Sequence, residues 1–465
     1  MNSRNYASFL DAKFKTHKPC GFRVDPDSLP HGLFPHQSDL VQWSIRKGAS
    51  AIFADTGLGK SRMEIAFADA VRKESGRDVL ILTPLAVAPQ MVEEGRAVGV
   101  EINHVRDDSD VRPGISVTNY DRLHRFDTDR FAGVVLDESS CIKHHNSKTL
   151  QTLLDTFQRT PYKLAATATP APNDWSELGT HAEFLGVRSR TEMLAEFFIH
   201  DGGDTQSWRL KGHARAEFWR WVASWGALIR SPADLGHDAS AYVLPALHFE
   251  QHTVENDAAH VGPYLFEMEA QTLMERRDAR RASMAERVKA CADMVNADQQ
   301  PWIVWCDLNA EGDALQAAIP GAVQVSGADD MDVKEQRLMD FAAGKFRVLI
   351  TKASIAGWGC NWQHCARVAF VGVTDSFEAF YQAVRRCWRF GQKREVWVHA
   401  FASKAEGAVV SNLRRKEADA RLMSDALSAE TLASVRAEIF GVTRETNIYA
   451  PAARIVVPSF LELAA

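Results

Sequence analysis

Short apolar runs alternate with amphipathic segments along most of the chain, which predicts strands followed by helices. Runs that are apolar at nearly every position are typical of parallel strands buried on both faces. The predicted strands fall in two groups, Val79–Thr83, Ile115–Asn119, Phe131–Leu136 and Lys163–Thr167, and then Trp302–Cys306, Val323–Ser326, Val348–Thr351, Val368–Val371 and Val396–Ala400. The pattern predicts an α/β protein with two lobes, each a parallel sheet flanked by helices.

The region between the two groups, residues 186–245, is rich in tryptophan. Its apolar residues follow helical spacing at Phe218, Trp221, Val222, Trp225, Leu228 and Ile229. We interpret this stripe as an amphipathic helix whose aromatic face packs on a lobe. The alternative is an exposed aromatic platform on which nucleic-acid bases stack.

A glycine-rich turn joins an apolar run to a helical pattern at Ala51–Ile65. Gly57 and Gly59 allow backbone N–H groups to point at phosphate oxygens. Lys60 supplies a positive charge for the outer phosphates, and the Ser61 hydroxyl can bind Mg²⁺. The first position of the usual phosphate-loop motif is Ala54 instead of glycine, but the anion-binding nest depends mainly on the later glycines.

Two carboxylates follow the predicted buried strand at Phe131–Leu136. Ligands of open α/β folds bind at the carboxyl ends of strands. Asp137 is therefore placed to hold Mg²⁺, and Glu138 to orient and deprotonate an attacking water.

A basic run at 385–394 has five basic residues and no acidic one. On a helix, Gln382, Arg386 and Arg389 share one face and can point together into a cleft. Two arginines facing a phosphate loop can stabilise a phosphoryl group in transit. The alternative is a solvated basic helix.

Composition limits the class of protein. The chain has 465 residues, 25% of them charged, and a net charge of −6, which argues against a uniformly basic polyanion coat but allows a local basic track. No apolar run is long enough to span a bilayer, so we expect a soluble, cytoplasmic protein without a membrane partner. Seven scattered cysteines indicate neither a disulfide framework nor a zinc site.

Residues Gln382–Gln392 resemble motif VI of the Swi/Snf-type ATPases, a branch of the superfamily 2 helicases. Other segments are similar to further motifs of the family in the expected order. These are Phe34–Gln37 (Q motif), Asp55–Ser61 (motif I), Thr83–Pro84 (Ia), Val117–Tyr120 (Ib), Asp137–Ser140 (II), Ala166–Pro170 (III) and Phe341–Asn361 (IVa and V). Ser139 and Ser140 depart from the usual Ala-His, and Trp388 replaces a common histidine.

The resemblance implies two RecA-like lobes with a site for ATP and Mg²⁺ between them. Because the lobes lack the large insertions of chromatin remodellers, it also implies a compact member of the family from a bacterial cell or a phage-infected host cell. The implied domains are an N-terminal extension (1–24), lobe 1 (25–185), a helical connector (186–245), lobe 2 (246–403) and a C-terminal helical brace or tail (404–465). The implied ATP-binding residues are Gln37, Ala54, Asp55, Thr56, Gly57, Leu58, Gly59, Lys60, Ser61 and Gln382. Catalysis is assigned to Lys60, Asp137, Glu138, Arg386 and Arg389, and the metal to Ser61 and Asp137. Nucleic-acid contact or coupling is assigned to Thr83, Pro84, Asn119, Thr167, Thr169, Lys352, Gly357 and Asn361.

The function that this resemblance implies is an ATP-dependent translocase on double-stranded DNA. A strand-separating DNA or RNA helicase is the alternative enzyme. A nucleotide-gated clamp on nucleic acid is the alternative from another class, although a clamp would not need Glu138 and both arginines.

Overall fold

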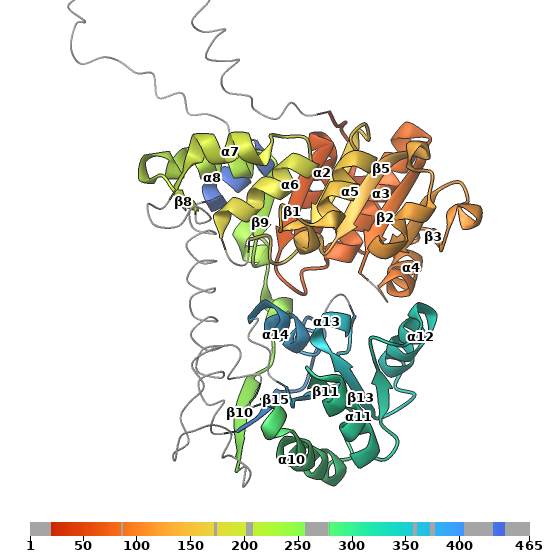
Figure 1. The fold of residues 1–465 in the computed structure, drawn as a ribbon. Helices are drawn as coiled ribbons and strands as arrows, with labels where there is room; N and C mark the ends of the chain where they lie inside the picture. Colours follow the sequence, from red (N-terminus) through yellow and green to blue (C-terminus); the bar gives the residue numbers. More distant parts are fainter. Residues whose placement is uncertain are drawn as a thin grey trace, which may run out of the picture.

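The computed structural model describes residues 20–84, 87–171, 174–200, 208–255, 278, 280–356, 360–372, 377–403 and 431–441. Its described strands form two large parallel sheets, each with helices packed on its faces (Figure 1). The predicted α/β architecture with two RecA-like lobes is confirmed. No helix in the described ranges combines the length and apolar character needed to cross a bilayer.

The first sheet places the phosphate-loop strand near one side of the first lobe. Seven described strands pair in the order β3-β4-β2-β5-β6-β1-β9. Their bounds are β1 (Ala49–Ala54), β2 (Asp78–Thr83), β3 (Ile102–His104), β4 (Ile115–Asn119), β5 (Phe131–Asp137), β6 (Tyr162–Ala166) and β9 (Gly226–Ile229). In β1, Ile52 and Ala54 enter one core, while Ala51 and Phe53 enter the core on the opposite face. Burial on both faces explains why the strands have unbroken apolar runs.

Helices cover both faces of this sheet. They are α2 (Pro35–Lys47), α3 (Lys60–Ser75), α4 (Ala88–Ala97), α5 (Lys148–Thr156), α6 (Leu178–Phe184), α7 (Arg190–Phe197) and α8 (Arg215–Ala223). Short 3₁₀ turns lie at Pro26–Ser28, Asp108–Asp110, Tyr120–Arg125, Thr128–Arg130, Ser139–Ile142, Trp175–Glu177, Gly212–Ala214, Pro232–Leu235 and Ser240–Tyr242. A small antiparallel pair, β7 (Phe198–His200) and β8 (Trp208–Leu210), extends from α7.

The aromatic stripe between the lobes is core, as predicted. Phe218, Trp221 and Trp225 are buried in the first lobe and contact one another edge-on or tilted. Their burial excludes a base-stacking platform at these rings. The predicted single helix is wrong in its extent, because α8 ends at Ala223 and residues 226–229 form β9 beside β1. The strand fits there because Gly226 lies against the Phe53 ring, where a Cβ would come within 3.0 Å.

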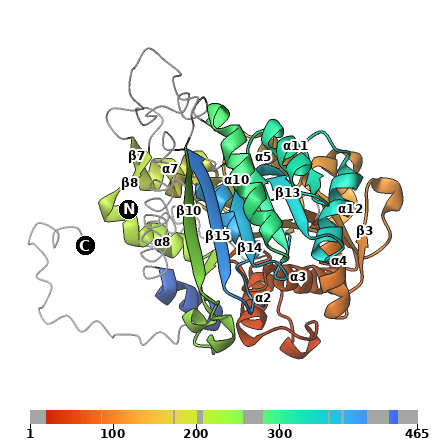
Figure 2. The same cartoon turned by 90° about the horizontal axis from the view of Figure 1, so that it is seen from below.

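The second lobe has the same layered design. Six described strands pair in the order β10-β15-β14-β11-β13-β12. Their bounds are β10 (Leu247–Val254), β11 (Trp302–Cys306), β12 (Val323–Val325), β13 (Val348–Lys352), β14 (Arg367–Phe370) and β15 (Val396–Ser403). The helices are α10 (Met284–Ala297), α11 (Asn309–Ala318), α12 (Met331–Ala342), α13 (Ala353–Ala356) and α14 (Phe377–Val384). Figure 1 shows α13 and α14 on the side of this lobe that faces the first lobe, and Figure 2 shows β10 at the sheet edge beside β15.

A described piece of the C-terminal segment returns to the first lobe. Residues 431–440 are helical, and Val435 and Ile439 enter a core of that lobe. Lys47 Nζ lies 2.6 Å from Glu438 Oε2. Arg436 donates to the carbonyl of Asp234 at 2.6 Å. This piece of the predicted tail is therefore anchored on the first lobe by both apolar and polar contacts.

Candidate active site

The phosphate loop lies between the end of β1 at Ala54 and the start of α3 at Lys60. Gly57 (φ 92°) and Gly59 (φ 81°) have left-handed backbone conformations, which side chains disfavour. Gln37 supports the loop from α2, because its Nε2 donates to the Leu58 carbonyl at 2.9 Å and its Oε1 accepts from Phe34 N. With the loop supported in this way, the backbone N–H groups at the N-terminus of α3 face the space where phosphates are predicted to bind.

Lys60 is fixed within the loop. Its Nζ donates to the Ala54 carbonyl at 3.0 Å and approaches the Asp55 carbonyl at 3.5 Å. Burial lowers the pKa of Lys60, while the charges of Glu138 and Asp55 act in the opposite direction. An anionic phosphate would give this buried ammonium a stronger hydrogen-bond partner than the neutral carbonyl oxygens that it contacts here.

The carboxylates of β5 are oriented by the neighbouring strand. Glu138 is buried and adopts φ 53°, the only positive φ of a non-glycine residue among those described. Thr167 Oγ1 donates to Glu138 Oε1 at 2.6 Å. Burial, aided by the charge of Glu138, raises the pKa of Asp137 to about 7. The neighbouring carboxyl groups of Asp137 and Glu138 repel each other, so their electrostatics favour the binding of a cation beside them.

Glu64 is a buried carboxyl group that the sequence did not single out. It lies on α3 one turn after Lys60, is fully buried, and shares a hydrogen bond with the carboxyl group of Asp137. Burial, followed by the charge of Asp137, raises the pKa of Glu64 well above its usual value. The i, i+4 spacing from Lys60 on a predicted helix could have revealed it.

The crowded carboxyl groups provide a test for Mg²⁺. Ser61 and Asp137 line the same cavity and offer the hard oxygen ligands that Mg²⁺ prefers. Burial and mutual repulsion raise the pKa values of Glu64 and Asp137, so a divalent cation bound beside them would favour their charged forms. The residues present therefore fit the predicted metal.

The second lobe contributes two arginines to this cavity. Arg386 donates through Nη2 to Gln382 Oε1 at 2.9 Å and through Nε to the Gln382 carbonyl at 3.0 Å. Arg389 Nη1 approaches the Cys360 carbonyl at 3.4 Å, and its buried Nε has no partner in the described part of the chain. Burial, followed by the charge of Arg386, lowers the pKa of Arg389 to about 9. Burial and the neighbouring charge disfavour the charged guanidinium, so an anion that binds beside Arg389 would stabilise it.

The predicted helical face for these arginines is wrong in its geometry. Helix α14 ends at Val384, and Arg386 and Arg389 lie in the turns that follow. The chain tightens there, with Arg386 N bonding to the Ala383 carbonyl, while Trp388 Nε1 anchors the turn to the Pro245 carbonyl at 2.7 Å. Both arginines still reach the cavity.

One cavity of ≈ 130 Å³ joins the groups from both lobes. It is lined by Phe34, Gln37, Thr56, Gly57, Gly59, Lys60, Ser61, Arg62, Glu94, Asp137, Glu138, Tyr242, Asn361, Gln363, Arg386, Arg389 and Phe390. Four of the predicted ATP-site residues, Ala54, Asp55, Leu58 and Gln382, lie beside it rather than on its lining.

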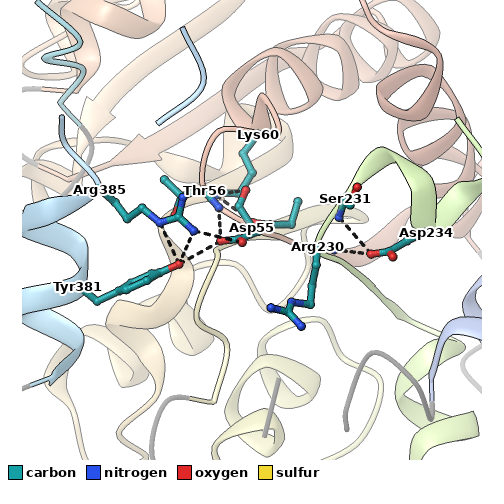
Figure 3. A network of polar contacts seen from close by, with 9 residues as sticks. Asp55, Thr56, Lys60, Arg230, Ser231, Asp234, Tyr381 and Arg385 are labelled. Carbon is teal, nitrogen blue, oxygen red and sulfur yellow. Dashed lines mark hydrogen bonds and ion pairs between the residues drawn. The ribbon is translucent and has the colours of Figure 1, made fainter. Parts of the chain in front are cut away.

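A polar network connects the phosphate loop to the second lobe (Figure 3). Asp55 Oδ1 accepts from Thr56 N at 2.6 Å and from the Tyr381 hydroxyl at 3.4 Å. Arg385 Nη2 lies 3.4 Å from Asp55 Oδ2 and 2.7 Å from the Tyr381 hydroxyl. Tyr381 and Arg385 were not predicted as site residues. A second bridge joins the lobes where Arg122 Nη2 meets Asp332 Oδ1 at 3.0 Å.

The expected basic track is only partly exposed. Arg385, Arg386 and Arg389 are turned into the interface between the lobes, whereas Lys393 and Arg394 face solvent. Two of the five basic residues in the run at 385–394 are therefore exposed, and Arg386 and Arg389 line the cavity as the sequence predicted. The long side chains of the three arginines are drawn inward by the carboxylates of the nucleotide cavity.

The residues assigned to nucleic-acid contact or coupling have different surroundings. The side chains of Thr83 and Asn119 are buried. The Thr83 hydroxyl approaches the Thr118 carbonyl, and the Asn119 side-chain oxygen accepts a hydrogen bond from Arg122 N. The assignment of Thr83 and Asn119 to nucleic-acid contact or coupling stays a prediction. Thr167 bonds to Glu138, Thr169 accepts from Gln382 Nε2 at 3.4 Å, and Asn361 lines the nucleotide cavity. Pro84 follows β2, Lys352 ends β13, and Gly357 lies outside the described residues.

Comparisons with known proteins give two similarities. An alignment of 178 residues, which covers 34% of this chain and 16% of the other protein, is 29% identical to the mouse DNA annealing helicase and endonuclease ZRANB3. The SWI2/SNF2 ATPase core of Sulfolobus solfataricus in complex with double-stranded DNA aligns over 90% of this chain and 99% of that one, with 17% identity and a TM-score of 0.41. No family model matches the chain. The resemblance to Swi/Snf-type helicase-like ATPases is supported by the sequence match to a helicase.

Proposed function

We propose that this chain is a Swi/Snf-type superfamily 2 ATPase that couples Mg-ATP hydrolysis between its lobes to movement along double-stranded DNA. The observation that carries the proposal is the single cavity in which Lys60, Asp137 and Glu138 of one lobe meet Arg386 and Arg389 of the other. These residues supply phosphate binding, metal binding, water activation and charge stabilisation in one place.

The chemistry follows from the position of each group. Lys60 and the loop N–H groups would bind the outer phosphates, with Ser61 and Asp137 holding Mg²⁺. Mg²⁺ supplies charge neutralisation to the phosphate oxygens. Glu138, oriented by Thr167, accepts a proton from the attacking water. Arg386 and Arg389 stabilise the charge on the transferred phosphoryl group.

The contacts between the lobes provide a route for coupling. Gln382 holds Arg386 and also reaches Thr169, two residues after the threonine that orients Glu138. Arg385 reaches Asp55 in the phosphate loop. Movement of one lobe against the other therefore shifts the positions of the arginines and of the water-activating carboxylate together. A chain that only clamped nucleic acid would not require this arrangement.

DNA is the proposed polymer because the motif resemblance is to a family that acts on DNA and the similar mouse protein is named a DNA annealing helicase. The matched stretch covers 16% of the mouse protein, so the proposal for this chain is limited to movement along DNA.

The decisive experiment is ATP turnover measured without polymer and with single-stranded DNA, duplex DNA or RNA. We expect duplex DNA to stimulate turnover most. Absence of duplex stimulation would contradict the proposal. A second assay separates movement from strand separation: a translocase displaces the third strand of a triplex and leaves a forked duplex intact, whereas a helicase opens the fork.

A further inference from the structure

Three metal-ligating side chains converge at the edge of the second sheet, on the lobe's outer strands rather than in the nucleotide cavity. Glu250 and His252 are two residues apart on β10, so their side chains emerge on the same face of the sheet. The parallel register places His399 of β15 directly beside Glu250. The pairing of β10 with β15 thus assembles a Glu-His-His group from positions almost 150 residues apart.

The donor atoms of this group face one another. His252 Nε2 lies 3.0 Å from His399 Nδ1. Glu250 Oε2 lies 3.4 Å from His399 Nδ1 and 3.8 Å from His252 Nε2. In a tetrahedral zinc site with bonds of about 2.0–2.1 Å, neighbouring ligand atoms are roughly 3.3–3.4 Å apart. The three separations bracket that value, so one ion fits among them with little rearrangement.

The surroundings leave one side of the group open. The side chain of His399 is mostly buried beside Trp302, that of His252 is partly buried beside Phe401, and that of Glu250 is largely exposed. Arg367, whose positive charge acts on His399, is itself paired with Asp298 at 3.4 Å. A water molecule can therefore provide a fourth ligand next to the exposed Glu250 side chain. Because Arg367 is paired with Asp298, it repels a cation at this group less than a free arginine would.

We propose that Glu250, His252 and His399 form a binding site for a divalent transition-metal ion of the zinc type, which fastens edge strand β10 to β15. Two imidazole nitrogens and one carboxylate favour Zn²⁺ over Mg²⁺, which prefers oxygen ligands. The site is separate from the Mg²⁺ site of the nucleotide cavity. β10 is the first strand of the second lobe after the chain leaves the first, so the ion stabilises the point at which the chain enters that sheet.

The test uses untagged, chelator-treated, nucleotide-free protein titrated with CoCl₂ and, separately, with ZnCl₂. We expect one Co²⁺ per chain with the visible absorption of a four- or five-coordinate ion, displacement of Co²⁺ by Zn²⁺, and a higher melting temperature with Zn²⁺. MgCl₂ at the same concentration should produce none of these changes.

Variants separate this site from other histidines. His252→Gln and Glu250→Gln should each weaken Zn²⁺ binding roughly tenfold or more, since each removes one of three ligands. His248→Gln is the matched control, because His248 lies on the same face of β10 but bonds to Glu395 instead. Circular dichroism and ATP binding verify that the variants are folded. Unchanged Zn²⁺ affinity in His252→Gln, an equal loss in His248→Gln, or no Zn²⁺ binding by the native chain would each overturn the proposal.

Discussion

Thr167 Oγ1 donates a 2.6 Å hydrogen bond to Glu138 Oε1, joining the residue after β6 to the residue after β5. Glu138 sits in a left-handed conformation that costs an ordinary residue about 1–2 kcal/mol. The bond offsets part of that cost and fixes the direction of the carboxylate. The strained backbone and the hydroxyl together hold the proposed water-activating group in one orientation.

Replacing Glu138 tests whether it activates water. Glu138→Gln keeps the size of the side chain and its ability to bond with Thr167 but removes its basicity. We expect ATP turnover to fall by about 10²-fold or more, within the usual range for a general base. ATP binding, measured by fluorescence of a nucleotide analogue, should be retained. A variant with native turnover would remove Glu138 from this role.

Replacing Thr167 tests whether orientation of Glu138 matters. Thr167→Val removes the hydroxyl and keeps the branched shape, while Thr167→Ser keeps the hydroxyl. A hydrogen bond to a charged group contributes about 1.5–3 kcal/mol, so we expect Thr167→Val to lower kcat roughly 10–100-fold. KM for ATP should change little. Thr167→Ser should stay near native, and an equal loss in both variants would point to packing instead.

Replacing Arg389 tests the contribution of the second lobe. Arg389→Ala removes a buried guanidinium whose Nε has no partner among the described residues, and we expect kcat to fall about 10³-fold. Arg389→Lys should recover little, because an ammonium cannot reproduce the planar set of donors. Lys393→Ala is the control from the same basic run, since Lys393 faces solvent. Comparable losses in Arg389→Ala and Lys393→Ala would contradict an active-site role.

The phosphate loop and the carboxylate strand could be predicted from sequence because local rules determine both. A glycine-rich turn between a strand and a helix, and a buried strand ending in Asp137, have few structural alternatives. Glu64, Tyr381 and Arg385 were missed because their roles depend on packing between distant segments. Edge strand β10 was also missed: only three of its eight residues, Leu247, Phe249 and Val254, are apolar, so it lacks the continuous run of the central strands.

The end of α14 could not be predicted for a different reason. Helical spacing alone placed Gln382, Arg386 and Arg389 on one face, but the bond from Trp388 to the Pro245 carbonyl draws the chain into a turn. That contact joins segments 143 residues apart and has no local signature. Arg386 and Arg389 nevertheless line the cavity, whereas Gln382 lies beside it and bonds to Arg386.

Substitution of Gly59 tests the conformation of the phosphate loop. At φ 81°, a Cβ on Gly59 would lie 2.2 Å from Gln37 Nε2, which itself supports the loop. We expect Gly59→Ala to weaken ATP binding roughly tenfold or more, as displaced backbone donors lose their alignment with phosphate. Gly76→Ala is the matched control at the other end of α3, because it has φ 65° but open space around its Cβ. It should lower stability similarly without affecting ATP affinity.

Acid sensitivity should arise in part from His181, which is fully buried on α6 with Nε2 3.1 Å from Ser139 Oγ, beside Glu138. Burial lowers the pKa of His181 to about 4, from 6.5. As the pH falls, His181 therefore gains a proton near pH 6.5 in the unfolded chain but only near pH 4 in the folded chain. Stability from this group is complete above pH 6.5 and is lost as the pH falls toward 4, by about 3 kcal/mol in total.

His181→Gln isolates this contribution, since glutamine can bond to Ser139 without titrating. The quantity to compare is the change in free energy of unfolding between pH 7 and pH 4, measured by urea titration of tryptophan fluorescence, because this change is independent of each protein's stability at pH 7. We expect a smaller change in His181→Gln than in the native chain. Equal changes would show that His181 is protonated alike in folded and unfolded states, contrary to the burial that sets its pKa.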